Sequence, residues 1–174
     1  MRKIIYLLFV ILFAGCATAD IDHLSQVQYQ GALLQSEQKI FVALPKDGAF
    51  GHIDYINSGR DVQQSFYDNF LRYTDQVILA KVELSIDEAK SQALKQNADI
   101  LVYPVISHWE DRNTPWSGLR DKVRINITVY SVKDGRTLDK TTMYATNNWL
   151  AFVNANPQNR LKTIIDPYVK ALYK

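Results

Sequence analysis

The first fifteen residues constrain most what this chain can fold into, because they have the pattern of a secretion signal and so do not belong to the folded domain. Arg2 and Lys3 precede a short apolar run over residues 4–14. This run is about half as long as the roughly 20 residues that cross a bilayer as a helix. Charged residues interrupt every later apolar segment. We therefore expect a signal peptide over residues 1–15 and a folded part after it.

Cys16, the only cysteine of the chain, directly follows this leader. A leader that ends in Ala-Gly-Cys resembles the lipobox of bacterial lipoproteins. The resemblance implies that Cys16 is the acylated first residue of the mature protein, with covalent lipid, palmitate included, and no other cofactor. Phe13 departs from the lipobox, which usually has leucine three places before the cysteine. The alternative is a soluble periplasmic protein cut at Ala17-Thr18-Ala19.

Ala17 is not the aspartate that retains such lipoproteins in the inner membrane of enteric bacteria, so the resemblance implies the inner leaflet of the outer membrane, facing the periplasm. We expect a lipidated cysteine and tether over residues 16–35 and one periplasmic domain over residues 36–174. The whole chain has 20 Lys and Arg and 18 Asp and Glu. Without Arg2 and Lys3 of the leader, basic and acidic residues are equal in number, so the mature protein has no net formal charge. This neutrality and the absence of a basic patch predict no nucleic-acid partner.

The pattern of apolar residues predicts five strands. They are expected over residues 39–45, 76–81, 98–109, 123–132 and 136–146. Pro45 ends the first of them, and Pro104 predicts a bulge or bend in the third. Asp134 and Gly135 form a hairpin turn signal before the last. Residues 46–60, which contain three glycines, are predicted to be a loop.

Three helices are predicted from apolar residues at helical spacing. The first begins at Asp61, with inward side chains Val62, Phe66, Phe70 and Tyr73 and outward side chains Gln63, Gln64, Asp68, Asn69 and Arg72. The second follows a capping box of Ser85 and Glu88 and packs through Ile86, Ala89, Ala93 and Leu94. The third runs from about Pro157 and packs through Leu161, Ile164, Ile165, Val169 and Leu172. Pro167 predicts a kink in it or its division into two helices.

The resulting element order is β-α-β-α-β-β-β-α. Strands that alternate with helices need crossover connections and parallel pairing, whereas the late hairpin is antiparallel. The predicted fold class is therefore α/β, or α+β, with a single domain in which helices pack against a mixed sheet.

Several segments resemble known periplasmic proteins. Residues 85–106 and 123–136 resemble an α/β module shared by the amino-terminal domain of TolB and by curli-secretion lipoproteins of the CsgG type. Residues 108–112 (His-Trp-Glu-Asp-Arg) and 116–118 (Trp-Ser-Gly) resemble a segment of DUF4823, a family of uncharacterised proteobacterial lipoproteins, and that resemblance covers nearly the whole mature chain. It implies an α/β fold in the envelope and carries no catalytic residues.

The segment 108–118 supplies a candidate interaction surface. Its candidate residues are His108, Trp109, Glu110, Asp111, Arg112 and Trp116. Exposed Trp and Arg are enriched at interaction hot spots, because they bury large areas with few rotatable bonds. The alternative is that both tryptophans cap the end of the core while the arginine pairs with an internal carboxylate.

Patterns typical of catalysis or metal binding are missing from the sequence. The three histidines, His23, His52 and His108, do not have the spacing of metal ligands, so no metal is expected. Glu110 and Asp111 are adjacent and would point to opposite faces of a strand. Neither a nucleophile elbow nor a phosphate-binding loop occurs. We therefore expect no enzymatic activity.

The expected function is a non-catalytic binding or assembly accessory of the cell envelope. A lipid anchor would hold the domain in a thin layer at the membrane and raise its effective concentration for an envelope protein partner. One alternative is a module that binds a glycan, a peptidoglycan fragment or a lipid, and a more remote one is a hydrolase.

Overall fold

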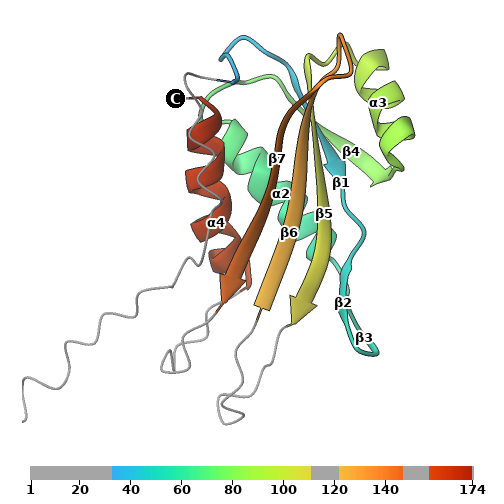
Figure 1. Ribbon diagram of the computed structural model, residues 1–174, viewed down its shortest axis with the longest axis vertical. Helices are drawn as coiled ribbons and strands as arrows, with labels where there is room; N and C mark the ends of the chain where they lie inside the picture. Colours follow the sequence, from blue (N-terminus) through green and yellow to red (C-terminus); the bar gives the residue numbers. More distant parts are fainter. Residues whose placement is uncertain (1–32, 111–121, 147–156, 174) are drawn as a thin grey trace, which may run out of the picture.

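A five-stranded sheet organises the residues that the computed structural model describes, which are 33–110, 122–146 and 157–173 (Figure 1). In spatial order its strands are β4 (Val77–Glu83), β1 (Ile40–Leu44), β5 (Ile100–Glu110), β6 (Lys122–Ser131) and β7 (Thr137–Thr146). The other elements are α2 (Ser58–Phe70), α3 (Ile86–Lys95), α4 (Pro157–Leu172) and a hairpin of β2 (Gly48–Phe50) and β3 (Ile53–Tyr55). β1 is parallel to β4 and β5, and β5, β6 and β7 are antiparallel, so the predicted mixed sheet is confirmed.

The predicted loop over residues 46–60 is wrong in part, since it contains the β2–β3 hairpin and the first residues of α2. Asp47 fixes the start of this helix. Its carboxylate accepts a bond from the backbone N–H of Gly59, at 2.8 Å, and a second from the preceding turn. The first N–H groups of a helix have no acceptor within the helix, and the Asp47 carboxylate supplies one for them. The helix can therefore begin at Ser58, ahead of the predicted start at Asp61.

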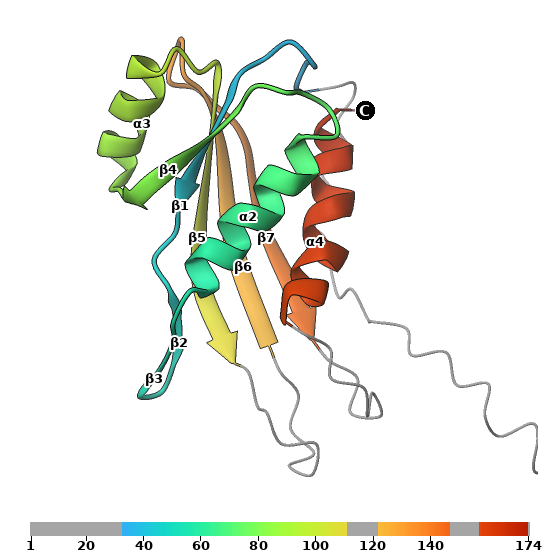
Figure 2. The ribbon, with the colours of Figure 1, turned by 180° about the vertical axis from the view of Figure 1, so that it is seen from behind.

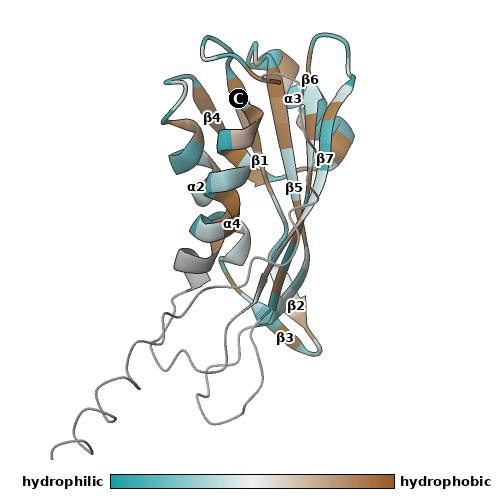
Figure 3. Cartoon of the chain, turned by 60° about the vertical axis from the view of Figure 1, so that its left-hand side comes forward, coloured by the Kyte–Doolittle hydropathy of each residue, from teal (hydrophilic) through white to brown (hydrophobic). Residues whose placement is uncertain are grey.

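The helices leave the two faces of the sheet unequally covered. α2 and α4 pack against one face, and α3 lies on the other face over one end only (Figure 1 and Figure 2). Figure 3 views the sheet from its side, with α2 and α4 together on one side of it. The residues buried between these helices and the sheet include the predicted packing side chains of α2 and α4 and the alternate residues of β6. They are Val62, Phe66, Phe70, Val123, Ile125, Ile127, Val129, Leu161, Ile164, Ile165, Val169 and Leu172.

A smaller core lies under α3. The buried Ala89 and Ala93 bring this helix close to β1 and β5. The predicted capping box is confirmed, because the Ser85 hydroxyl accepts the backbone N–H of Glu88 and the glutamate carboxylate accepts the backbone N–H of the serine. Leu94 is 62% exposed, so its predicted place on the packing side is wrong. The narrow stripe of alanines, four residues apart, is the part of α3 that meets the sheet.

Two polar residues that were predicted to face solvent, Gln63 and Asn69, are buried. The register of β1 against β4 shifts between Val42 and Leu44, and such an irregularity leaves carbonyl groups that need another donor. The side-chain amide of Gln63 donates to the carbonyl oxygens of Val42, at 3.1 Å, and Ala80, at 3.0 Å. A polar side chain therefore ties α2 to both parallel strands.

α4 is one helix through Pro167, so of the two predicted outcomes, a kink or a division into two helices, the division does not occur. A proline inside a helix costs about 3 kcal/mol, and burial of the apolar side of α4 against α2 and β7 offsets this cost. The buried Tyr168 adds a hydrogen bond of 2.6 Å from its hydroxyl to the carboxylate of Asp139 on β7. Within the described ranges, no helix has the length and apolar character needed to cross a membrane.

Replacing Gln63 by leucine is expected to lower the free energy of unfolding by about 1–3 kcal/mol, because leucine fills similar space and leaves two buried carbonyl groups without their donor. Urea denaturation followed by circular dichroism measures this loss. Gln64→Leu, at the adjacent exposed position, is the control and should change stability by less than about 0.5 kcal/mol. Equal stability of the two variants would contradict the role given to the buried amide.

Candidate functional site

The structure describes three of the predicted site residues, and all three lie at the end of β5. The side chain of His108 is 30% exposed, whereas Trp109 and Glu110 are 2% and 3% exposed. The predicted residues that lie outside the described ranges are Cys16, Asp111, Arg112 and Trp116. The roles given to those four residues therefore stay predictions.

A β-bulge at Ser107 decides where these side chains point. The register of β5 against β6 shifts between Ile106 and His108. In a regular strand every second side chain shares a face, so His108 would follow Ile106 onto the helix-covered face. The extra residue reverses this order: Trp109 joins Ile106 in the main core, while His108 and Glu110 share the other face. There the imidazole Nε2 lies 3.2 Å from a carboxylate oxygen of the glutamate.

Trp109 is a core residue, so its predicted place on an exposed surface is corrected, and the alternative that it caps the end of the core describes its position. The β2–β3 hairpin lies against it. A Cβ on Gly48 would stand 2.4 Å from the Cβ of Trp109 and 2.8 Å from the Cγ2 of Ile106, so only glycine allows this approach. From the same hairpin, Phe50 meets the ring of His108 edge to face, with 5.2 Å between ring centroids.

The part of the sheet that α3 does not cover forms a surface that we call the open face. Three rows of paired residues cross β5, β6 and β7 there, and all nine side chains are exposed or half-buried. The rows are Tyr103, Thr128 and Lys140; Val105, Asn126 and Thr142; and His108, Arg124 and Tyr144.

Contacts between strands order the side chains of the open face. The guanidinium of Arg124 lies over the ring of Tyr144, 4.6 Å from its centroid. The Thr142 hydroxyl donates to the side-chain oxygen of Asn126 at 2.8 Å. Paired side chains of this kind are held before a partner arrives, so less conformational entropy is lost on binding.

The chemistry of the open face is that of a binding surface with positive charge. Arg124 and Lys140 are exposed, whereas Glu110, which shares this face at the end of β5, is buried beside His108. Arginine and tyrosine are enriched among the residues that dominate binding energy. In the described part of the chain, no group of three or more His, Cys, Asp or Glu could hold a metal ion.

A second feature arises where β1 stops pairing with β5. Their ladder ends at the pair Val42 and Val102. The backbone N–H of Ile100 donates to the carbonyl oxygen of Lys39, at 3.1 Å, so the even-numbered residues of β5 direct their backbone groups toward β1.

Two prolines prevent the next step of this ladder. A continued register would require Pro104 to donate to the carbonyl of Ala43 and Pro45 to donate to the carbonyl of Pro104. Proline has no N–H, so neither bond can form. Pro104 therefore does not cause the bulge of β5, which lies at Ser107; it ends the pairing with β1 instead.

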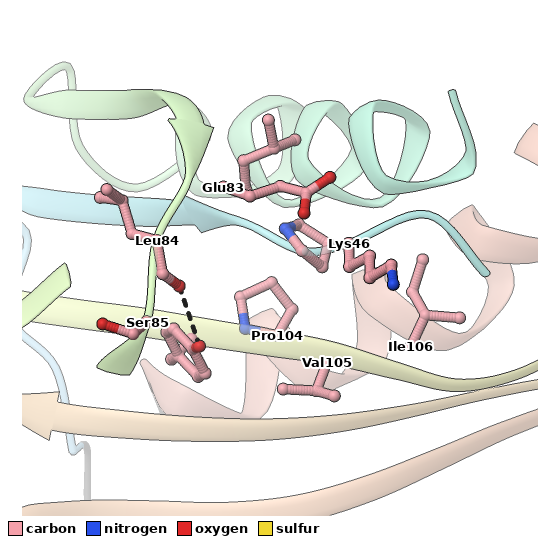
Figure 4. A pocket seen from close by; sticks show the side chains of 10 residues that line it. Lys46, Glu83, Leu84, Ser85, Pro104, Val105 and Ile106 are labelled. Carbon is pink, nitrogen blue, oxygen red and sulfur yellow. Dashed lines mark hydrogen bonds between the residues drawn. The ribbon is translucent and has the colours of Figure 1, made fainter. Parts of the chain in front are cut away.

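The separation of β1 from β5 opens a cavity of about 300 Å³ at the carboxyl ends of β1 and β4 (Figure 4). Pro104 and Val105 lie on one side of it, and segments 44–46 and 83–85 form the others. At one end the Tyr103 hydroxyl donates to the carbonyl oxygen of Leu84 at 3.0 Å. Burial raises the pKa of Tyr103 above its ordinary value, so the phenol keeps the proton that it donates. In open α/β sheets, ligands bind at the carboxyl ends of strands.

Sequence reasoning missed both the open face and the cavity as sites. The signal for the open face was the alternation of Arg124, Asn126 and Thr128 with apolar residues in β6, which places three polar side chains on one face of the strand. From the sequence, Pro45 was predicted to end one strand and Pro104 to bend another, with no relation between the two. The signal for the cavity is that Pro45 and Pro104 fall at the same step of the ladder between two parallel strands. The sequence alone does not give the register of those strands, so this coincidence cannot be recognised from it.

Two solved structures have a similar fold. A PelC dodecamer from Paraburkholderia phytofirmans matches with a TM-score of 0.65 and 14% identity, over 83% of this chain and 94% of that chain. The lipoprotein GNA1162 from Neisseria meningitidis matches with a TM-score of 0.52 and 10% identity, over 72% and 93%. TolB from Acinetobacter baumannii matches with a TM-score of 0.41 and 12% identity, over 82% of this chain and 30% of that chain.

No curated protein matches the sequence. The family model described as a domain of unknown function, DUF4823, matches residues 32–172, which include every described helix and strand of the domain. This match confirms the resemblance stated on residues 108–112 and 116–118. The chain belongs to the DUF4823 family.

Proposed function

We propose that this protein is a lipoprotein of the bacterial envelope, anchored through Cys16 in the inner leaflet of the outer membrane. Its periplasmic domain is a non-catalytic binding or assembly accessory that contacts an envelope protein. The leader sequence and the fold shared with the lipoprotein GNA1162 support this location. The observation that carries the binding role is the open face, where three strands present ordered polar and aromatic side chains to solvent.

The charge of the open face determines the kind of partner. Arg124 and Lys140 are exposed and the neighbouring Glu110 is buried, so the charges that this surface presents to solvent fit a partner with acidic side chains. Charges at a surface act over about 8–10 Å at physiological ionic strength. The lipid anchor restricts the search for this partner to the layer next to the membrane, which raises the effective concentration without any new contact.

Substituting both Arg124 and Tyr144 by alanine is expected to reduce capture of the envelope partner at least about tenfold, because the stacked pair belongs to the residue types that dominate binding energy. In-cell crosslinking followed by affinity capture measures this, and capture by the unchanged protein should fall as salt rises. Arg60→Ala, an exposed arginine on α2, is the control. Unchanged capture by the double variant, with an unchanged melting temperature, would contradict the role of the open face.

The anchor is tested by labelling cells with radioactive palmitate. The unchanged protein should be labelled and found in the outer-membrane fraction, and Cys16→Ala should be unlabelled, because acylation requires the thiol. An unlabelled unchanged protein would favour the soluble periplasmic alternative, with cleavage within residues 17–19.

A second copy of this chain is the second candidate partner. The similar PelC chain is described as a dodecamer. In this chain the described sheet ends in β4 and β7, and an edge strand presents unpaired backbone groups that another strand can use. At the end of β4, Val82 is 61% exposed, which gives that edge an apolar side chain to bury.

Light scattering on the purified Cys16→Ala protein measures this self-association. If copies assemble through β4, the mass should be a multiple of the chain mass, and Val82→Asp should lower it to that of one chain, since a buried unpaired charge opposes edge pairing. Leu94→Asp is a matched control, because Leu94 is 62% exposed on α3. A monomeric mass for the unchanged protein at all concentrations would exclude this candidate.

A further inference from the structure

We propose that the cavity between β1 and β5 binds a short peptide with free ends, held in an extended conformation along the edge of β5. This site shares Tyr103 and Val105 with the open face, but it does not depend on the partner proposed for that face. The occupant takes the place that β1 would fill if its ladder with β5 continued past Val42.

The backbone of β5 supplies the first reason for a peptide. Even-numbered residues of this strand direct their backbone groups toward β1, so the carbonyl of Pro104 faces the cavity side of the strand. The nitrogen of Pro45, which a continued ladder would place opposite that carbonyl, carries no hydrogen. A strand edge with a carbonyl acceptor is the surface to which extended peptides add, through their own N–H groups.

The charges at the rim supply the second reason. Lys46 belongs to the segment that follows β1, and Glu83 is the last residue of β4. Figure 4 shows the ammonium group beside Ile106, at one end of the cavity, and the carboxylate farther along it, over the middle between Lys46 and Pro104. A ligand that spans the two would place its amine at the glutamate and its carboxylate at the lysine. A peptide with both termini free has these two charges at its ends.

The size and lining of the cavity limit the peptide. A volume of about 300 Å³ is at the lower end of the range for ligand pockets, which is about 300–1,000 Å³. Leu44, Pro104 and Val105 provide apolar surface between the two charged side chains. We therefore expect two or three residues with small apolar side chains, in preference to a long segment or an aromatic peptide.

The test uses the full-length Cys16→Ala protein and tri-alanine as the probe, with N-acetyl-tri-alanine amide as the uncharged comparison. Nuclear magnetic resonance titration should show saturable shifts of the Val105 and Ile106 amides with tri-alanine and at least about tenfold weaker binding of the capped peptide. Glu83→Gln and Lys46→Gln should each weaken tri-alanine binding about tenfold. Both residues are exposed, so these variants should fold normally, which an unchanged melting temperature verifies.

Glu37→Gln and Lys95→Gln are matched controls, because they remove the same charges at exposed positions that do not line the cavity. The proposal is overturned if tri-alanine does not bind saturably, if the capped peptide binds equally well, or if the rim variants bind like the controls. The variant with Arg124 and Tyr144 replaced by alanine should still bind tri-alanine. Its loss of partner capture together with intact peptide binding separates this site from the open face.

Discussion

The constraint on which the rest of this structure depends is the missing hydrogen-bond donor at Pro45 and Pro104. A parallel ladder continues only while every second residue of each strand donates and accepts, and the β1–β5 ladder ends at the first step that needs both prolines. From that point the chain cannot continue as a central strand. It turns into the β2–β3 hairpin, leaves a cavity beside β5, and returns to β5 only near Trp109, where Gly48 allows a close approach.

The bulge at Ser107 has a complementary effect on the other side of the strand. Without it, the side chains past Ile106 would be reversed, with an imidazole and a carboxylate directed at the helices and a tryptophan directed at solvent. With it, Trp109 seals the end of the main core, and His108 joins Arg124 and Tyr144 in one row. The eleven residues of β5 therefore contribute side chains to the main core, to the open face and to the wall of the cavity.

Most of the fold could be predicted from the sequence, because its signals are local. The period of apolar residues in β6 and α4, the capping box of α3 and the hairpin turn each depend on residues close together in the chain. Gln63 could not be predicted, because its burial depends on carbonyl groups that a register shift exposes in two distant strands. The same limit applies to the site: a one-residue bulge decides whether Trp109 is core or surface, and single-sequence patterns do not reveal it.

The place where the chain enters the domain relates the proposed anchor to the proposed surface. The backbone N–H groups of Leu33 and Leu34 both donate to the carbonyl of Leu172, so the chain enters beside the end of α4 (Figure 1). Leu34 is 1% exposed, so residues before 36 already belong to the packed domain. The hairpin and the His108 end of β5 lie at the opposite end of the domain (Figure 1). The proposed lipid at Cys16 would therefore be joined to the domain at its entry end, which is the end away from the row of His108 and Arg124.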